Sequence, residues 1–295
     1  MDAVPAPAGV HPDAPAHPGV HPDAFIHPAA YVAPGASIGP GCRIGPGCVV
    51  SADAVLEAGV ELMAHVVVDG RAFIGAGAKI YPFATIGLPP QDLKYKGEPT
   101  GVSIGARTQI REHATIHRGS TGGEGMTRIG ADCLVMCVAH VGHDCRIGDG
   151  VILVNNVMLA GHAEIGDFAI IQGGAAVQQF VRIGRMAMVA GMSGVERNVL
   201  PYGRAKGYRA KLHGLNTIAM RRRLGLSKDQ VMVVARAVHD LYRGGRPEDH
   251  VEAIAAAHPG NALVAEILSF AANRGRHGLC PFGRAAEEDE GGEAA

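Results

Sequence analysis

Residues 147–183 read IGDGVILVNNVMLAGHAEIGDFAIIQGGAAVQQFVRI, and an aliphatic side chain occupies every sixth position of this stretch. The same period of six runs without a miss from Val20 to Ile86, continues through 104–116, and covers Ile129 to Val195. Four positions after each aliphatic residue, the side chain is nearly always small. Neither a helical period of 3.6 nor a strand period of 2 produces this pattern. It predicts a hexapeptide parallel β-helix in which three hexads form one triangular coil of 18 residues.

Two interruptions and one change of pattern divide the chain. The interruptions lie at roughly 87–103 (GLPPQDLKYKGEPTGVS) and 117–128 (HRGSTGGEGMTR), and both follow the third hexad of a coil, so both loops should emerge along one edge. From about Pro201 the period of six gives way to helical signals, with Ser227 as an expected N-cap. We therefore expect an extra arm or degenerate coil at 1–19, a β-helix over 20–200, a helical domain at 201–276 and a disordered acidic tail at 277–295.

Composition excludes several function classes. The 295 residues contain 27 Lys+Arg and 28 Asp+Glu, a formal net charge of -1, so the chain as a whole offers no basic field for nucleic acid. Apolar runs fall short of the ~18 residues of a membrane span, and the N-terminus does not resemble a signal peptide, so membrane insertion is not expected. Six cysteines without close paired spacings favour a reducing compartment. We expect a cytoplasmic protein.

Ionisable side chains gather beside the two interruptions; they are His117, Arg118, His140, His143, Asp144 and His162. Their hexads are 18 residues apart, which places His143 and His162 on neighbouring coils with His140 at the preceding corner. Gln179 lies two coils beyond His143 in the same column. A histidine beside a carboxylate can act as a general base in acyl transfer. Three histidines can instead bind zinc and leave a fourth position open, so both chemistries remain open on this evidence.

Several longer motifs carry a family resemblance; they are QDLKYKGEPT (91–100), IHRGS (116–120), AHVGHDC (139–145), NNVMLAGH (155–162) and GLNTIAMRRR (214–223). From about Ala24 to about Arg276 the chain resembles the UDP-N-acetylglucosamine acyltransferases that begin lipid A synthesis in Gram-negative bacteria. The resemblance implies a left-handed coil and a homotrimer. It also implies transfer of an (R)-3-hydroxyacyl group from acyl carrier protein to the sugar 3-hydroxyl of UDP-N-acetylglucosamine. No metal and no coenzyme is implied beyond the carrier's phosphopantetheine.

The same resemblance implies roles for individual residues. His143 matches the catalytic base, Asp144 the acid that orients it, and Gly161 the glycine whose N–H faces the oxyanion. The implied substrate-binding residues are Asp92, Lys94, His117, His140, His162, Gln179, Asn216, Arg222 and Arg223. Gly191 matches a position where a small residue leaves room for a longer acyl chain. The chain departs from the family pattern at Gln178, where a histidine is usual, at Ile218, where a carboxylate is expected, and at Leu224, which looks like an insertion.

A run of basic residues between 204 and 228 suggests where an acidic partner binds. In a nearly neutral chain, a local basic patch is the surface expected to meet an acidic carrier protein. We expect Arg204, Arg209 and Lys211 to contact the carrier. Two other interpretations use the same coil, a zinc-dependent hydratase of the carbonic anhydrase type and a non-catalytic binding solenoid. The zinc interpretation does not explain the QDLKYKGEPT loop or the arginine-rich helix, and a binding solenoid needs no convergent histidines.

Overall fold

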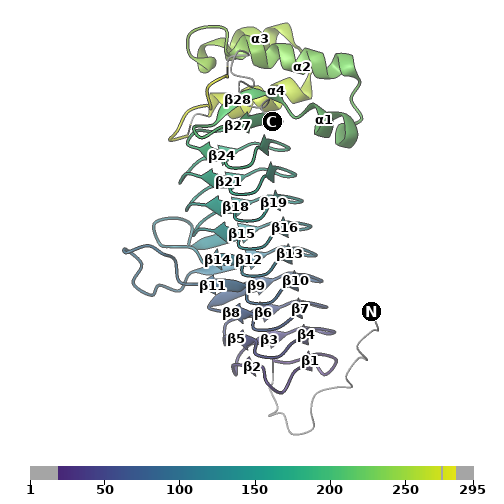
Figure 1. The fold of residues 1–295 in the computed structure, drawn as a ribbon, viewed down its shortest axis with the longest axis vertical. Helices are drawn as coiled ribbons and strands as arrows, with labels where there is room; N and C mark the ends of the chain where they lie inside the picture. Colours follow the sequence, from purple (N-terminus) through teal and green to yellow (C-terminus); the bar gives the residue numbers. More distant parts are fainter. Residues whose placement is uncertain (1–18, 274, 284–295) are drawn as a thin grey trace, which may run out of the picture.

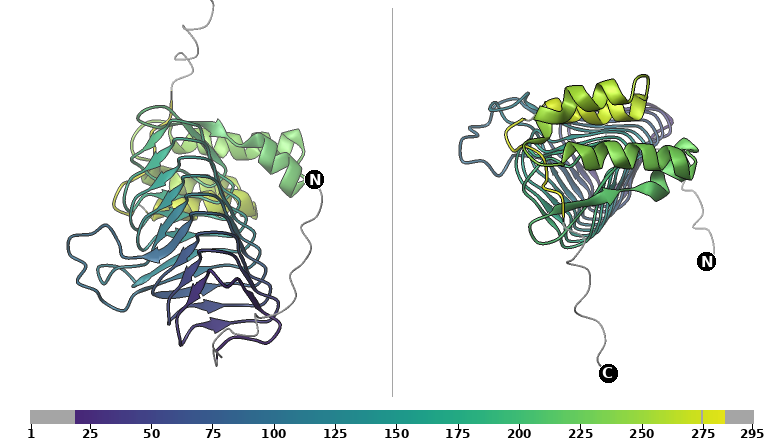
Figure 2. Two further views of the ribbon diagram at one scale, coloured as in Figure 1. Left: turned by 60° about the horizontal axis from the view of Figure 1, so that its bottom comes forward. Right: turned by 90° about the horizontal axis from the view of Figure 1, so that it is seen from above.

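The computed structural model describes residues 19–273 and 275–283. Each hexad forms a short strand followed by a corner, and the strands stack into a left-handed parallel β-helix, as the period of six predicts (Figure 1). Seen from above, the coil has a triangular outline (Figure 2). Its three faces are three sheets, named here sheets A, B and C, each built from every third strand of the coil.

The strand bounds follow the repeat. Sheet A contains β3 (Ser37–Ile38), β6 (Val55–Leu56), β9 (Arg71–Ile74), β12 (Gly101–Ile104), β15 (Met126–Ile129), β18 (Arg146–Ile147), β21 (Glu164–Ile165) and β24 (Arg182–Ile183). Sheet B contains β1 (Phe25–Ile26), β4 (Arg43–Ile44), β7 (Glu61–Leu62), β10 (Lys79–Ile80), β13 (Gln109–Ile110), β16 (Leu134–Val135), β19 (Ile152–Leu153), β22 (Ile170–Ile171), β25 (Met188–Val189), β27 (Gly203–Lys206) and β28 (Lys211–Leu215). Sheet C contains β2 (Tyr31–Val32), β5 (Val49–Val50), β8 (Val67–Val68), β11 (Thr85–Leu88), β14 (Thr115–His117), β17 (His140–Val141), β20 (Met158–Leu159), β23 (Ala176–Val177) and β26 (Gly194–Val195).

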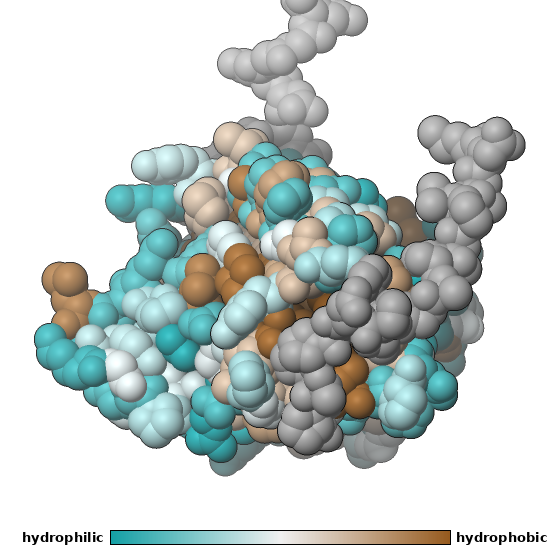
Figure 3. Space-filling model, turned by 90° about the horizontal axis from the view of Figure 1, so that it is seen from below, coloured by the Kyte–Doolittle hydropathy of each residue, from teal (hydrophilic) through white to brown (hydrophobic). Residues whose placement is uncertain are grey.

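The core is the column of aliphatic and small side chains inside the coil. Ile44, Ile80 and Val141 are fully buried, and so are Cys42 and Cys48 at the small positions. Each strand pairs in parallel with the strand one coil away, so that identical positions of the hexad stack on one another. Figure 3 looks onto the N-terminal end of the coil and shows apolar side chains at its centre within a largely hydrophilic rim.

The corners explain the abundance of glycine. Glycine directly after the aliphatic position is required by the close approach of neighbouring coils, since a Cβ on Gly45 would lie 1.4 Å from the carbonyl oxygen of Met63. Two positions later, the backbone takes a positive φ, and here the chain often uses other residues, including Asp144 at 58° and His162 at 61°. The left-handed corner conformation therefore presents functional side chains outward.

Both insertions leave the corner between sheets C and A, called here the C/A corner, which confirms the expected common edge (Figures 1 and 2). The first joins β11 to β12 and spans 89–100, and the second joins β14 to β15 and spans 118–125. Both loops are shorter than predicted because the flanking strands extend into residues predicted as loop. Gly101 of β12, for example, pairs with Met126 of β15.

The C-terminal region begins differently from the prediction of helices from residue 201. β27 continues sheet B by pairing with β25, and β28 folds back antiparallel to β27, so 203–215 is a hairpin. Helices follow only from residue 217; they are α1 (Thr217–Leu224), α2 (Lys228–Leu241), the 3-10 turn η1 (Pro247–His250), α3 (Val251–Ala257) and α4 (Ala262–Ala272). They sit over the C-terminal end of the coil (Figure 1). Ser227 caps α2 through a capping box, as predicted.

The predicted disordered tail begins too early. Leu279 and Cys280 are buried, and the Cys280 N–H donates a hydrogen bond to the Asn198 carbonyl oxygen at 2.7 Å. Residues 277–283 therefore lie against the coil, because their apolar side chains have a surface to cover. The predicted arm at 1–18 and the tail from 284 lie outside the described residues. Within 19–273 and 275–283, no helix has the length and apolar character needed to cross a membrane.

Candidate active site at the C/A corner

Three successive turns of the C/A corner present the predicted functional side chains in columns. The register pairs Val141 with Leu159 and Leu159 with Val177, so the residues that follow these strands stack along the coil axis. The stacked residues are His143 and Asp144, then Gly161 and His162, then Gln179 and Phe180. The arrangement predicted from the 18-residue spacing is confirmed for His143, His162 and Gln179.

His143 and Asp144 form a hydrogen-bonded pair. His143 Nδ1 lies 2.8 Å from Asp144 Oδ2, and the same oxygen accepts hydrogen bonds from Ser120 N at 2.9 Å and Ser120 Oγ at 2.7 Å. Burial alone raises the pKa of Asp144, but the hydrogen bonds from His143 and Ser120 outweigh it, and the net pKa lies below its ordinary value. Asp144 is therefore an anion that can only accept, so His143 Nδ1 donates the hydrogen bond between them, and in the neutral form of the ring Nε2 is then the acceptor.

The free edge of His143 faces Gly161. A Cβ on Gly161 would lie 2.7 Å from both Cε1 and Nε2 of His143, so the imidazole occupies the space that any larger residue would need. The edge of His143 also meets the His162 ring, with centroids 5.0 Å apart, and His162 stacks on Phe180 at 4.3 Å. The backbone of one coil and the rings of the next two hold the reactive nitrogen in a fixed direction.

His117 of β14 and His140 of β17 form a second pair on sheet C. His140 lies within β17 and projects outward from the sheet, rather than at the predicted corner, and its Nδ1 is 2.8 Å from Thr115 Oγ1. His117 is buried with its ring 5.0 Å from that of His140. Burial, and then the nearby His140 and His143, lower the pKa of His117 to about 4, and burial also lowers the pKa of His140. Both imidazoles are neutral near pH 7.

The buried neutral His117 makes stability depend on pH. Between its ordinary value of 6.5 and its folded value of about 4, the unfolded chain binds a proton that the folded chain does not. The free energy of unfolding is thus expected to fall as the pH drops from 6.5 to 4, by about 3 kcal/mol from this residue. Urea titrations of the wild type and of His117→Gln at several pH values measure this, and the variant should show the flatter profile. Equal slopes would contradict it.

The two loops close the site from outside the coil. In the first loop, the Lys94 N–H donates to Asp92 Oδ1 at 3.0 Å. Burial lowers the pKa of His162 below its ordinary value, and the carboxylates of Asp144 and, to a smaller extent, Asp92 oppose this shift. In the second loop, a Cβ on Gly123 would lie 2.5 Å from Asp144 Cγ. The close packing of Gly123 covers Asp144, while Ser120 binds it. Sequence reasoning missed both residues because they lie where the register is interrupted.

Four predicted residues do not reach this corner within one chain. Gly191 lies at the corner between sheets B and C, where its N–H donates to Gln172 Oε1 at 3.1 Å. Asn216 caps α1 by accepting from Ala219 N, and its Nδ2 donates to the Met186 carbonyl oxygen at 3.0 Å. Arg222 and Arg223 lie on α1, where the Arg223 guanidinium sits 4.6 Å over Phe168 at the corner between sheets A and B. One subunit alone separates these groups from His143.

The predicted carrier contacts divide between two places. Arg209 and Lys211 line a cavity of about 420 Å³ at the β27–β28 hairpin, together with Lys206 and Tyr208. Arg204 points outward from β27 and is not among the residues that line this cavity. The exposed Arg209 guanidinium also lies 3.8 Å from the Glu196 carboxylate. The hairpin thus provides a basic patch of Lys206, Arg209 and Lys211.

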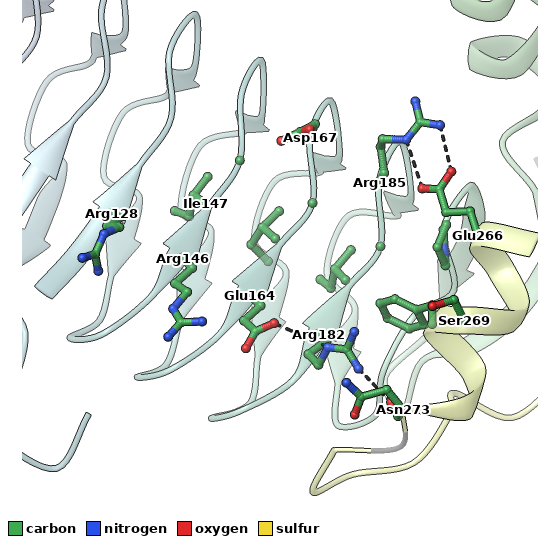
Figure 4. Close-up of a pocket in the computed structure, with 17 residues that line it drawn as sticks. Arg128, Arg146, Ile147, Glu164, Asp167, Arg182, Arg185, Glu266, Ser269 and Asn273 are labelled. Carbon is green, nitrogen blue, oxygen red and sulfur yellow. Dashed lines mark hydrogen bonds and ion pairs between the residues drawn. The ribbon is translucent and has the colours of Figure 1, made fainter. Parts of the chain in front are cut away.

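A wider cavity of about 640 Å³ lies on sheet A beside α4 (Figure 4), and His143 is not among the residues that line it. Its charged side chains already have partners. Arg182 is 3.4 Å from Glu164, and Arg185 makes a two-pronged ion pair with Glu266 of α4. The Arg185–Glu266 pair holds α4 against the coil, and so does the hydrogen bond that Arg182 Nη1 donates to the Asn273 carbonyl oxygen at 2.7 Å. This cavity is therefore a packing feature of the domain junction.

The donor atoms of His143, Asp144 and His162 lie within 4.8 Å of one another, a spacing that a metal ion could also use. This set is not the three histidines that the zinc interpretation needed, because His140 binds Thr115 instead. Asp144 Oδ2 accepts three hydrogen bonds, one of them from His143, whereas Oδ1 is buried and accepts none from the described residues. The geometry favours a base and its orienting carboxylate.

Comparisons with known proteins identify relatives of this chain. A family model described as Udp N-acetylglucosamine O-acyltransferase, domain 2, matches residues 198–280, and the bacterial transferase hexapeptide model matches 17–52 and 126–161. Two relatives carry the name acyl-[acyl-carrier-protein]--UDP-N-acetylglucosamine O-acyltransferase. The one from Thermodesulfovibrio yellowstonii is 52% identical over 63% of this chain and 71% of its own, and the one from Caulobacter vibrioides is 47% identical over 75% and 84%. The solved UDP-N-acetylglucosamine acyltransferase from Campylobacter jejuni superposes with a TM-score of 0.82 at 33% identity, covering 88% of this chain and 100% of that one.

Proposed function

The chain belongs to the UDP-N-acetylglucosamine O-acyltransferase family, and from this premise we propose that His143 is the general base of its acyl transfer. The donor is an acyl carrier protein and the acceptor is UDP-N-acetylglucosamine. The observation that carries the proposal is the His143 Nδ1 to Asp144 Oδ2 hydrogen bond of 2.8 Å, with Nε2 directed to Gly161.

The proposed reaction is a proton transfer coupled to acyl transfer. The 3-hydroxyl oxygen of the sugar attacks the thioester carbon while His143 Nε2 takes the hydroxyl proton. The Gly161 N–H, which makes no hydrogen bond within the described chain, donates to the oxyanion of the tetrahedral intermediate. Collapse of the intermediate breaks the carbon–sulfur bond, and the imidazolium returns its proton to the departing thiolate. Asp144 holds the imidazole and stabilises its positive form.

The surrounding residues support binding of the acceptor at this edge. Asp92 and Lys94 lie on the loop that covers the corner, and the neutral His140 and His162 offer uncharged ring nitrogens for sugar hydroxyls. The resemblance at these positions supports a sugar nucleotide acceptor and the first step of lipid A synthesis. An (R)-3-hydroxyacyl donor and a chain-length limit at Gly191 belong to the same proposal.

The test is an assay of the purified protein with UDP-N-acetylglucosamine and a series of hydroxyacyl carrier proteins. The expected product is the 3-O-acyl sugar nucleotide, with one donor length preferred. Added chelator should leave the rate unchanged, since no proposed step needs a metal or a coenzyme. Loss of activity on chelation would favour the zinc interpretation. Binding of the sugar nucleotide without turnover would favour the scaffold interpretation.

We also propose a homotrimer joined through sheet C. Among the described residues, no Asp, Glu, Lys or Arg projects outward from a sheet C strand, whereas sheet A carries Arg128, Arg146, Glu164 and Arg182. Exposed apolar side chains gather on sheet C and on its corner with sheet B; they are Tyr31, Val49, Phe83, Val138, Met158 and Met192. Such a surface favours contact with further copies of the chain.

A trimer would bring the separated residues together. His143 from one subunit and Arg222 from its neighbour would then complete one site. Co-expression of His143→Ala with Arg222→Ala should restore about a quarter of the wild-type activity, the fraction of sites that receive both intact residues on random mixing in a ring. Each variant alone should be nearly inactive. If the mixture is no more active than its components, both residues act within one subunit.

We place the carrier at the hairpin patch of Lys206, Arg209 and Lys211, with Arg204 beside it. An acidic carrier protein is complementary to this patch. Arg209→Glu is expected to raise the KM for acyl carrier about tenfold, while the KM for UDP-N-acetylglucosamine stays unchanged. Steady-state kinetics measure both, with Arg43→Glu on sheet B as the matched charge reversal. Unchanged KM for the carrier would contradict this placement.

A cytoplasmic location is proposed with the function. All six cysteines are free thiols and five of them are buried, which suits a reducing compartment.

A further inference from the structure

A polar cavity of about 510 Å³ lies beyond Phe180 at the C-terminal end of the C/A corner. Gln178 and Glu196, which follow β23 and β26, form its floor together with Arg197. Arg276 and His277 line it from the segment that follows α4. No step proposed above uses this cavity.

The segment that carries Arg276 is fixed to the coil. His277 Nε2 donates to the Gln179 carbonyl oxygen at 2.8 Å, and the Asn198 N–H donates to the Gly278 carbonyl oxygen at 2.9 Å. The Arg276 guanidinium lies 3.9 Å from the centre of the Phe180 ring, a cation–π contact. Arg276 thus stands at the end of the row of rings formed by His143, His162 and Phe180.

The cavity has an excess of positive charge. Within the described chain, neither Arg197 nor Arg276 has a carboxylate at ion-pair distance, while the one acid of the cavity, Glu196, lies 3.8 Å from Arg209. Two arginines that converge on an open polar space are suited to a phosphate, which accepts several charge-assisted hydrogen bonds. The Glu196–Arg209 pair also joins this cavity to the basic hairpin patch.

The distance from His143 identifies which phosphate fits. Arg197 and His143 occupy the same hexad position three coils apart, and three strand spacings of ~4.8 Å separate them by about 14 Å. The arm of an acyl carrier runs from its thioester to its phosphodiester through a chain equal to about four extended residues, which also spans about 14 Å. In the acceptor, by contrast, the 3-hydroxyl and the first phosphate are separated by a single sugar ring.

We infer that Arg197 and Arg276 form a binding site for the phosphodiester of the donor's phosphopantetheine arm. This inference rests on the proposed function. The carrier would dock on the hairpin patch, its phosphate would bind in the cavity, and its thioester would then reach His143. Because the arm has a fixed length, binding its phosphate in the cavity places the thioester carbonyl at the coil that carries His143.

The experiment compares two small donors that differ only in this phosphate, an acyl-phosphopantetheine and the matching acyl-pantetheine. The wild type is expected to have the higher kcat/KM for the phosphorylated donor. Arg197→Gln and Arg276→Gln should each reduce that preference about tenfold, because each removes one charge-assisted hydrogen bond to the phosphate. Their kcat/KM for acyl-pantetheine and their KM for UDP-N-acetylglucosamine should stay unchanged, and Arg276→Lys should retain part of the preference.

Arg43→Gln is the matched control, because Arg43 also lies over an aromatic ring, Phe25, but on sheet B far from the corner. An unchanged preference in both glutamine variants would overturn the inference. So would a rise in the KM for UDP-N-acetylglucosamine alone, which would assign the arginines to the acceptor's pyrophosphate. A wild type that transfers no acyl group from any donor would instead overturn the function itself.

Discussion

Replacing His143 with alanine is expected to lower kcat by about 10²- to 10⁴-fold, the usual contribution of a general base. The KM for both substrates should change little, because Nε2 takes up the proton in the transition state and is not needed to bind either substrate. His143 Nδ1 is held 2.8 Å from Asp144 Oδ2, a contact that alanine removes together with the base. Steady-state kinetics with saturating acyl carrier and UDP-N-acetylglucosamine measure the loss.

His239→Ala is the control for this prediction, since His239 lies on α2 with most of its side chain exposed. Its kcat should match that of the wild type. A folded His143→Ala protein that retains full acyl transfer would remove His143 from the mechanism and leave the column of rings as a structural feature.

Gly161→Ala is expected to reduce kcat about 100-fold without unfolding the coil. The new Cβ would lie 2.7 Å from His143 Nε2, so the imidazole must move, and a displacement of about 1 Å at the reacting group can have an effect of this size. The backbone N–H at this position is retained in alanine. Gly161 has no positive φ, so the backbone accepts alanine.

A double variant separates this effect from a general disturbance. If Gly161→Ala acts by displacing His143, it should change little when His143 is already alanine, so the two losses should not add. Full additivity of the two losses would show that Gly161→Ala acts independently of the base.

Most of the fold could be predicted because every sixth residue is aliphatic and enters the core of the coil. The period of six fixes which side chain enters the coil, and the 18-residue coil then fixes which residues stack, so the columns of His143, His162 and Gln179 follow from arithmetic. The structural reasons for individual corner residues could not be predicted from the sequence. The close approach of the next coil at Gly45 and the positive φ at Asp144 depend on how neighbouring coils stack, and this cannot be read from the residue types alone.

The remainder of the site depends on segments without a period. Ser120 and Gly123 contact Asp144 from a loop whose path is set by packing, and Arg276 reaches Phe180 from the far end of the chain. The prediction of helix is wrong for the hairpin at 203–215, because a strand pair at the end of a coil has no hexad repeat of its own. Local pattern predicts the coil, whereas tertiary contacts determine how the site is completed.

The most direct measurement of the central claim is the single-turnover rate of acyl transfer in H₂O and in D₂O, for the wild type and for His143→Ala. If His143 removes the proton from the 3-hydroxyl as the ester bond forms, the wild type should react more slowly in D₂O, and the variant should be slow in both solvents. Equal rates in the two solvents for the wild type, together with an unimpaired variant, would contradict the account.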